Sequence, residues 1–235
     1  MIELHDINYA YRKRPPALRG VNANFAAGKL HGLYGPNGCG KSTLLKIITG
    51  ELTPDSGQAK PKFGSPLERA RRLALVEQNT PTALPLTVRE VVALGRYPWR
   101  RDAAPTEIVS QVLAWLQLAP LADCRYAQIS GGEQQRVMLA RALAQDTEIL
   151  LLDEPSSALD FGHQQNFYQL LRQLAEQGRC VIMVTHDLFQ APQFLHQAWL
   201  MNKGQIIAAG NPEKVLEKNN LNLVYAVGKE AACRG

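Results

Sequence analysis

The residues with the clearest chemistry lie in one glycine-rich segment, GPNGCGKST at 35–43. It fits the pattern G-x-x-x-x-G-K-[ST], in which backbone N–H groups converge on phosphate oxygens. A strand expected at 30–34 and a helix expected from Lys41 to Thr49 give the loop the flanking elements of such a site. Lys41 can then reach the outer phosphates of a nucleotide, and the Ser42 oxygen can bind Mg²⁺. The alternative is a glycine turn that happens to precede a helix.

A pair of carboxylates, Asp153 and Glu154, stands near the end of the segment EILLLDEP at 148–155. The hydrophobic run indicates a buried strand, and open α/β sheets bind ligands at the carboxyl ends of their strands. One carboxylate can hold Mg²⁺ while the next polarises a water molecule. A strand that simply ends in a charged turn is the alternative, but the order of the two segments along the chain favours a phosphate site.

Two glycines stand where a helix is expected to begin, in ISGGE at 129–133. Each glycine at a helix start costs about 1 kcal/mol relative to alanine. Ser130 and Glu133 have the spacing of a capping box, so a well-capped helix is the plain interpretation. A capping box does not need Gly131 or Gly132, however. The two glycines therefore call for a second explanation.

The elements that must position these residues alternate along the chain. We expect strands at 30–34, 73–77, 148–153 and 180–185, and helices from Lys41 to Thr49 and from Gln164 to Glu176. Such alternation predicts an α/β fold with a parallel sheet. From about Thr82 to Asp146 the pattern becomes helical, so a helical unit is inserted into the sequence of the sheet. A hairpin at 199–210 and a helix capped by Asn211 with Pro212 follow.

Composition narrows the class of protein without selecting a ligand. The chain has 26 Lys plus Arg and 21 Asp plus Glu, a net charge of +5, which suits phosphates, an anionic membrane face or nucleic acid equally. The longest aliphatic runs have strand length, far short of the ~20 residues of a membrane span, so we do not expect a channel. No signal peptide or CxxC pair occurs, which predicts free thiols in a cytosolic protein at Cys39, Cys124, Cys180 and Cys233.

Six segments occur in the order and rough spacing of one known family: GPNGCGKST, Gln78, ISGGE, LLLDEP, SALD and VTHD. With these segments the chain resembles the ATP-binding cassette (ABC) ATPases. The resemblance covers nearly the whole chain. The resemblance implies a P-loop NTPase (RecA-like) core with an antiparallel β subdomain and an inserted helical subdomain. It implies one ABC ATPase domain over 1–235, with the core in 1–81 and 147–235 and the helical signature subdomain in 82–146.

The family arrangement also implies a role for Gly131 and Gly132. Two subunits pair head to tail, with ATP between the phosphate loop of one and the signature ISGGE of the other, so a lone subunit should hydrolyse ATP poorly. The helix N-terminus would then point its N–H groups at the γ-phosphate on the partner chain, where side chains would obstruct the approach. ISGGE departs only mildly from the commoner LSGGQ. The implied ATP contacts are Tyr11, Gly35, Pro36, Asn37, Gly38, Cys39, Gly40, Lys41, Ser42, Thr43, Ser130, Gly131, Gly132, Glu133 and Asp160.

The resemblance assigns three catalytic roles. Glu154 would be the general base for the attacking water, His186 would hydrogen-bond the γ-phosphate, and Gln78 would contact Mg²⁺ and the water. Taken alone, a histidine after a buried strand is more often structural, and Gln78 could be an exposed loop amide.

Further roles follow for the metal, the adenine and the dimer seam. The Mg²⁺ ligands would be Ser42, Gln78 and Asp153. Asp160 would lie at the dimer seam. Tyr11 would stack on adenine with Tyr9 as its rival, and either could instead be a core residue. Only the backbone of Cys39 is needed, so no thiol chemistry is expected there.

Two segments indicate which class of transporter the ATPase would drive. LTVREVVALGRYPWR at 86–100 and LDFGHQ at 159–164 resemble ATPases of iron–siderophore, haem and vitamin B12 importers. The first segment would form the groove for the coupling helix of the permease. The implied partners are a second copy of the chain, polytopic permease subunits and indirectly a substrate-binding protein. The implied location is peripheral, on the cytoplasmic face of the cell membrane, the inner membrane of a bacterial cell.

Alternatives remain at this stage. Another cargo, such as a metal ion, an amino acid or a lipid, would suit the same motifs. A non-transport ABC ATPase acting on nucleic acid or ribosomes is the rival class, but such proteins usually carry tandem cassettes, so no nucleic acid is expected. Residues 58–77 are shorter than usual for the family and rich in Lys and Arg, which could alter a strand of the β subdomain or form a solvated face.

Overall fold

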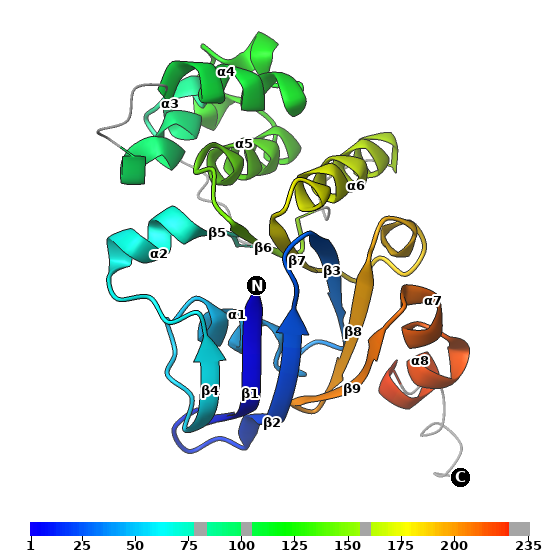
Figure 1. The fold of residues 1–235 in the computed structure, drawn as a ribbon. Coiled ribbons are helices and arrows are strands. Elements are labelled where there is room, and N and C mark those ends of the chain that lie inside the picture. Colours follow the sequence, from blue (N-terminus) through cyan, green and yellow to red (C-terminus); the bar gives the residue numbers. More distant parts are fainter. Residues whose placement is uncertain (78–83, 100–104, 156–160, 226–235) are drawn as a thin grey trace.

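The computed structural model describes residues 1–77, 84–99, 105–155 and 161–225. Gln78, Asp160 and Cys233, which carry predictions from the sequence, lie outside these residues. The described chain forms two sheets with helices around the larger one (Figure 1).

The larger sheet has six strands in the order β5-β6-β7-β3-β8-β9. The first five run parallel and β9 is antiparallel to β8. The four strands expected from hydrophobic runs are all present, and the expected hairpin is β8–β9. Their bounds are β3 (Lys29–Tyr34), β5 (Leu73–Val76), β6 (Ile149–Asp153), β7 (Cys180–Val184), β8 (Gln197–Asn202) and β9 (Gln205–Gly210).

A second, antiparallel sheet has the order β2-β1-β4. Its strands are β1 (Ile2–Ala10), β2 (Pro16–Phe25) and β4 (Ser56–Lys60). In β2 the buried residues Leu18, Val21, Ala23 and Phe25 are separated by exposed residues, as expected for a sheet with one solvent-exposed face. The fold class expected from the family resemblance, a parallel core with an antiparallel β part, is confirmed.

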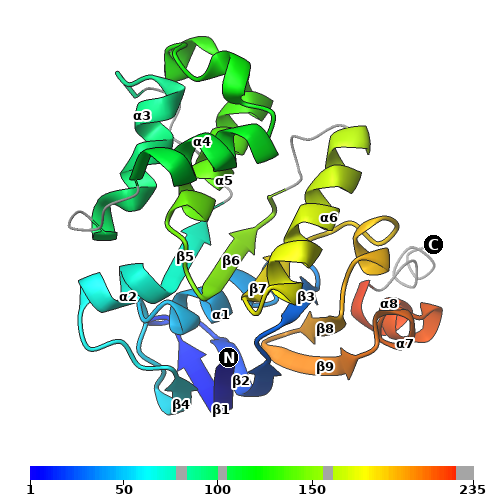
Figure 2. The ribbon, with the colours of Figure 1, turned by 45° about the horizontal axis from the view of Figure 1, so that its top comes forward.

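Helices surround the central sheet and form a separate group beyond β5 and β6. In Figure 1 and Figure 2 the group of α3, α4 and α5 lies at the end of the sheet formed by β5 and β6, whereas α7 and α8 lie beside β8 and β9. The α-helices are α1 (Lys41–Ile48), α2 (Pro66–Arg72), α3 (Val88–Ala93), α4 (Pro105–Trp115), α5 (Gly131–Ala144), α6 (Phe161–Glu176), α7 (Pro212–Val215) and α8 (Lys218–Tyr225). The 3₁₀ helices are η1 (Leu94–Trp99), η2 (Ala119–Leu121), η3 (Tyr126–Gln128) and η4 (Ala191–Gln193).

The central sheet divides the core into two clusters because successive strand residues face opposite sides. From β6, Leu150 and Leu152 join a cluster with α3 to α6, whereas Ile149 and Leu151 join a cluster with α1 and the antiparallel sheet. Both faces of β6 are thus buried, which explains its unbroken apolar run.

The segment 58–77 contains the end of strand β4, helix α2 and strand β5, and the sequence did not predict α2. Ser65 caps α2 by accepting a hydrogen bond from the N–H of Glu68 at 3.1 Å, and Pro66 begins the helix. Arg71 donates from Nε to the carbonyl of Pro98 at 3.1 Å. Arg72 pairs with Glu148 at 3.4 Å. Part of the basic run therefore joins α2 to its neighbours rather than forming only a solvated face.

Candidate nucleotide site

The glycine loop begins where β3 ends and leads directly into α1. Gly35 and Gly40 have φ angles of 149° and 111°. A Cβ atom at Gly35 would overlap the backbone carbonyl of Met201, and one at Gly40 would lie 2.6 Å from the carbonyl of Ala17. The glycines are thus required by close backbone packing as well as by the turn.

Lys41, the first residue of α1, folds back over this loop. It is only 7% exposed, and its Nζ donates to the carbonyls of Gly35 at 2.7 Å and Pro36 at 3.1 Å. Gly40 provides no side-chain cap for α1. A buried ammonium beside uncapped helical N–H groups is a site for an anion such as phosphate.

Ser42 and Asp153 bring two oxygen ligands together from α1 and β6. The Ser42 hydroxyl donates to Oδ2 of Asp153 at 3.3 Å. Burial raises the pKa of Asp153, and the neighbouring carboxylate of Glu154 raises it further, while Ser42 and Lys41 oppose the shift. A half-buried carboxylate that lies beside a hydroxyl fits a hard divalent cation such as Mg²⁺, which would favour its ionised form.

Glu154 and His186 meet because their strands, β6 and β7, are neighbours in the parallel sheet. The Glu154 Oε1 and His186 Nε2 atoms lie 2.8 Å apart. Glu154 has a φ of 52°, and its N–H donates to the carbonyl of Val184 at 3.0 Å. Gln135 of α5 donates to the Glu154 carbonyl at 3.4 Å. A left-handed backbone at a non-glycine residue costs free energy, so these contacts hold a strained turn at the strand end.

Asp187, to which the sequence analysis gave no role, fixes the backbone next to His186. Its carboxylate accepts hydrogen bonds from the N–H groups of Phe189, Gln190 and Ala191 at 2.8–3.0 Å and from the Tyr168 hydroxyl at 2.9 Å. Burial works to raise the pKa of Asp187, but these hydrogen bonds outweigh it and lower the pKa. An aspartate shortly before a short helical turn is a capping signal that could have revealed this residue.

The signature glycines begin α5, as expected, and the capping box is present. The N–H of Ser130 donates to Oε2 of Glu133 at 2.8 Å, and the Ser130 hydroxyl accepts from the N–H of Glu133 at 3.4 Å. The Ser130 contacts lower the pKa of Glu133. Within the described part of the chain, no atom lies within 4 Å of a Cβ atom placed at Gly131. Packing within the chain therefore does not require this glycine.

Tyr11 is the tyrosine that reaches the phosphate loop. Its hydroxyl lies 3.3 Å from the Thr43 hydroxyl. Tyr9 instead packs against the cluster beneath the antiparallel sheet and contacts Tyr11 edge to face, with ring centroids 5.0 Å apart. The position of Tyr11 favours it over Tyr9 for a nucleotide contact.

The other predicted residues of the loop differ in exposure. Asn37 and Gly38 are exposed at its tip, Pro36 is half-buried, and Cys39 is buried. Burial raises the pKa of the Cys39 thiol, which agrees with the expectation of no thiol chemistry. Gly132, at the start of α5, is half-buried.

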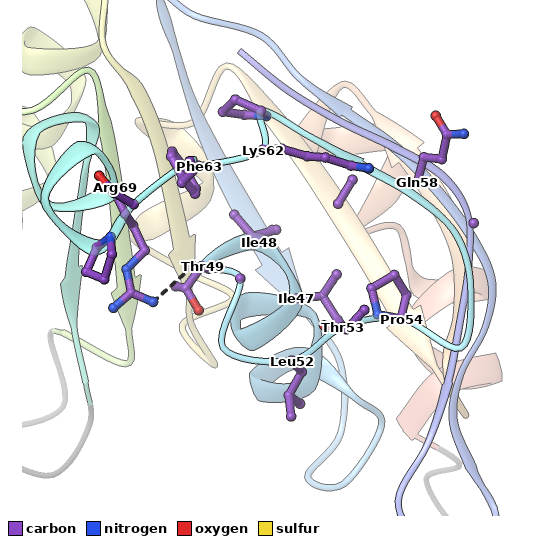
Figure 3. A pocket seen from close by; sticks show the side chains of 17 residues that line it. Ile47, Ile48, Thr49, Leu52, Thr53, Pro54, Gln58, Lys62, Phe63 and Arg69 are labelled. Atoms are coloured by element: carbon purple, nitrogen blue, oxygen red, sulfur yellow. Dashed lines mark hydrogen bonds between the residues drawn. The ribbon is translucent and has the colours of Figure 1, made fainter.

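A cavity of about 590 Å³ lies at the opposite end of α1, away from the phosphate loop (Figure 3). Ile47, Ile48 and Phe63 line it, together with Lys62 and Arg69 of the segment 58–77. Arg69 donates to the carbonyl of Thr49 at 3.3 Å and so caps the end of α1. This cavity contains none of the predicted nucleotide contacts.

The arrangement of strand, glycine loop, buried lysine and strand-end carboxylate defines a P-loop nucleotide-binding protein. Within the described ranges, no helix has the length and apolar character needed to cross a bilayer.

Comparison with known proteins gives the family. Residues 18–157 match the family model described as ABC transporter. The chain is 42% identical over 218 residues to the hemin import ATP-binding protein HmuV of Escherichia coli O157:H7, covering 87% of this chain and 84% of that protein. It is 40% identical over 238 residues to the protein of the same name from Shewanella denitrificans, with 96% and 93% covered. The chain belongs to the ABC transporter family.

Solved structures agree with this assignment. The chain matches cbiO1 from Clostridium perfringens, part of the ABC transporter complex cbiONQ, with a TM-score of 0.81, 27% identity and 94% of each chain covered. It matches the dimeric post-hydrolysis ATP-binding cassette MJ0796, bound to ADP and Pi, with a TM-score of 0.79, 30% identity and coverage of 90% and 99%. The expected ABC ATPase is thus confirmed: the chain is an ATP-binding, ATP-hydrolysing subunit of a transporter.

Proposed function

We propose that the chain drives the import of haem or a chemically related iron chelate. The observation that carries this cargo is the similarity to hemin import ATP-binding proteins over most of both chains. The resemblance of residues 86–100 to ATPases of siderophore, haem and vitamin B12 importers supports the same class. Siderophores and vitamin B12 are the nearest alternatives within it.

The hydrolytic step follows from the groups gathered at the strand ends. Ser42 and Asp153 would hold Mg²⁺, with Gln78 as a further ligand, and the ion would neutralise charge on the phosphates. Glu154 would take a proton from the attacking water. Support comes from its carboxylate, which lies 2.8 Å from His186 Nε2 and so has a partner that fixes its orientation. His186 would bind the γ-phosphate once nucleotide is present.

The second half of the site would come from another copy of the chain. Gly131 leaves the N-terminus of α5 open, so a phosphate of the partner's nucleotide could approach its N–H groups. The dimeric structure of the similar cassette MJ0796 supports this arrangement. Asp160 would lie at the seam between the two copies.

The permease would dock on the surface that includes η1. Leu94 and Tyr97 of η1 are 46% and 57% exposed and offer apolar surface to a partner. A coupling helix of the permease would cover them and hold the chain at the cytoplasmic face of the membrane. A substrate-binding protein would deliver the cargo on the opposite side.

Growth on defined iron sources tests the cargo. A strain that lacks this reading frame should not grow when haem is the sole iron source, and should grow normally on a ferrous salt. The wild-type chain should restore growth on haem, and Glu154→Gln should not. Cys124→Ser is the control, because Cys124 is an exposed free cysteine to which no role in the site is assigned. Unimpaired growth of the deletion strain on haem, with failure on a ferric siderophore, would reassign the cargo.

A further inference from the structure

The last described helix, α8, reaches the first residue of the phosphate loop. The N–H of Gly35 donates to the Tyr225 hydroxyl at 3.1 Å, across 190 residues of sequence. The sequence analysis gave Tyr225 no role. This contact links a segment outside the family motifs to the centre of the nucleotide site.

Gly35 needs a partner of this kind because it lies just beyond the ladder of β3. The final register pairs of β3 join Leu33 to Val184 and Tyr34 to Leu200. Gly35 is buried, and its backbone packs closely against the carbonyl of Met201. A buried N–H without a partner is unfavourable, and the Tyr225 hydroxyl provides that partner.

Gly35 also connects Tyr225 to the lysine of the site. Its N–H donates to Tyr225, and its carbonyl accepts from Nζ of Lys41 at 2.7 Å. The two hydrogen bonds use the peptide groups on either side of the Gly35 Cα atom, so they are linked by the backbone geometry of this residue. A shift of Gly35 would therefore move the carbonyl that holds the Lys41 ammonium.

Helix α8 is itself held in place, so it can act as a fixed support. Val224 is buried, and Asn220 donates from Nδ2 to the carbonyls of Lys214 and Val215 at 3.1 and 3.2 Å. These carbonyls belong to α7, which lies beside β8 and β9 (Figure 1). Burial raises the pKa of Tyr225, so its phenol stays neutral at physiological pH.

We propose that Tyr225 is a positioning residue for ATP: its hydroxyl fixes Gly35, and Gly35 sets the position of Lys41. This inference rests on the proposed use of the loop and Lys41 to bind the phosphates of ATP. It assigns α8 a part in nucleotide affinity and makes no use of the cargo.

The test compares Tyr225→Phe with the wild-type full-length chain. The variant keeps the ring and removes only the hydroxyl, so ATP should bind about 3- to 10-fold more weakly by titration with a fluorescent ATP analogue. In the complex with the permease, the KM for ATP should rise by a similar factor while kcat changes less than twofold. Amide hydrogen exchange in a peptide spanning residues 30–41 should become faster.

Two controls separate positioning from general stability. Leu223→Ala alters a 70% exposed side chain on the same helix and should leave ATP affinity unchanged. Val215→Ala removes buried methyl groups from α7 and should lower the melting temperature without changing ATP affinity. Should Tyr225→Phe not fold, Tyr225→Met removes the hydroxyl in another way.

The possible results have distinct meanings. Wild-type affinity in Tyr225→Phe overturns the inference, and so does an equal loss of affinity in Val215→Ala. Failure of the wild-type chain to bind the ATP analogue contradicts instead the proposed use of the phosphate loop. The inference is supported if ATP binds more weakly to Tyr225→Phe but not to the two control variants.

Discussion

At the scale of single residues, the site depends on groups whose surroundings limit what they can do. Lys41 is buried beneath two carbonyls, Asp153 has a raised pKa, and Glu154 occupies a strained backbone position against His186. A bound nucleotide with its cation would interact favourably with two of these groups, because it supplies negative charge to Lys41 and positive charge to Asp153.

Glu154→Gln should uncouple binding from hydrolysis. The amide keeps the size of the side chain but cannot accept a proton from water, so turnover should fall about 10²-fold or more. ATP affinity, measured by equilibrium titration, should stay within about twofold of wild type, because that change is under 1 kcal/mol. If the variant released phosphate at the wild-type rate, Glu154 would have no part in the mechanism.

At the scale of elements, α2, η1 and α5 are joined by one aromatic side chain. Trp99 donates from Nε1 to the carbonyl of Gln145 at 2.7 Å, and the guanidinium carbons of Arg71 and Arg96 lie 5.2 and 5.6 Å from its ring centroid. Gln145 in turn donates to the carbonyl of Leu73 at 2.9 Å. In the segment GRYPWR, Arg96 and Trp99 are thus engaged within the chain, whereas the side chain of Tyr97 is 57% exposed.

Trp99→Ala should loosen the helical group from the rest of the chain. Loss of a half-buried indole, its hydrogen bond and two cation–π contacts should lower the free energy of unfolding by about 2 kcal/mol. Urea unfolding followed by circular dichroism measures this change. Trp115→Ala is the control, since Trp115 is 41% exposed, and it should cost clearly less. Equal losses in the two variants would argue against the role given to Trp99.

At the scale of the whole molecule, the described chain holds both segments that we propose to meet across an ATP-bound dimer. The phosphate loop lies between β3 and α1, and the signature lies at the open start of α5. Because Gly131 has free space around it, a side chain there should not disturb the fold of one copy. It should disturb only an approach from outside.

Gly131→Leu should therefore separate folding from assembly. Its melting temperature should stay within about 2 °C of wild type, because a Cβ atom at this position meets no described residue within 4 Å and a surface change costs about 0.5 kcal/mol. Both proteins also carry Glu154→Gln and are saturated with ATP. In sedimentation, the protein that keeps Gly131 should be a dimer, and the protein with Gly131→Leu should be a monomer. A dimer of equal strength in both would show that the signature glycine does not face a partner.

Local motifs were predictable because their residues are contiguous in the chain. The fit of GPNGCGKST to a phosphate loop, the capping box of Ser130 and Glu133, and the buried strand ending at Asp153 each depend on a few neighbouring residues. The alternation of apolar strands and helices predicted the parallel sheet for the same reason. Helix α2 was missed because its basic residues show no apolar face and gain several of their partners from distant parts of the chain, namely Thr49, η1 and Glu148.

The sequence by itself thus determined the class of fold, the phosphate loop and the strand-end carboxylates. The tertiary structure alone decided which distant groups meet: His186 with Glu154, Tyr11 with Thr43, and Tyr225 with Gly35. The physical reason is that these contacts depend on the order of strands in the sheet and on where the final helix docks. Neither is encoded in the spacing of residues along one segment.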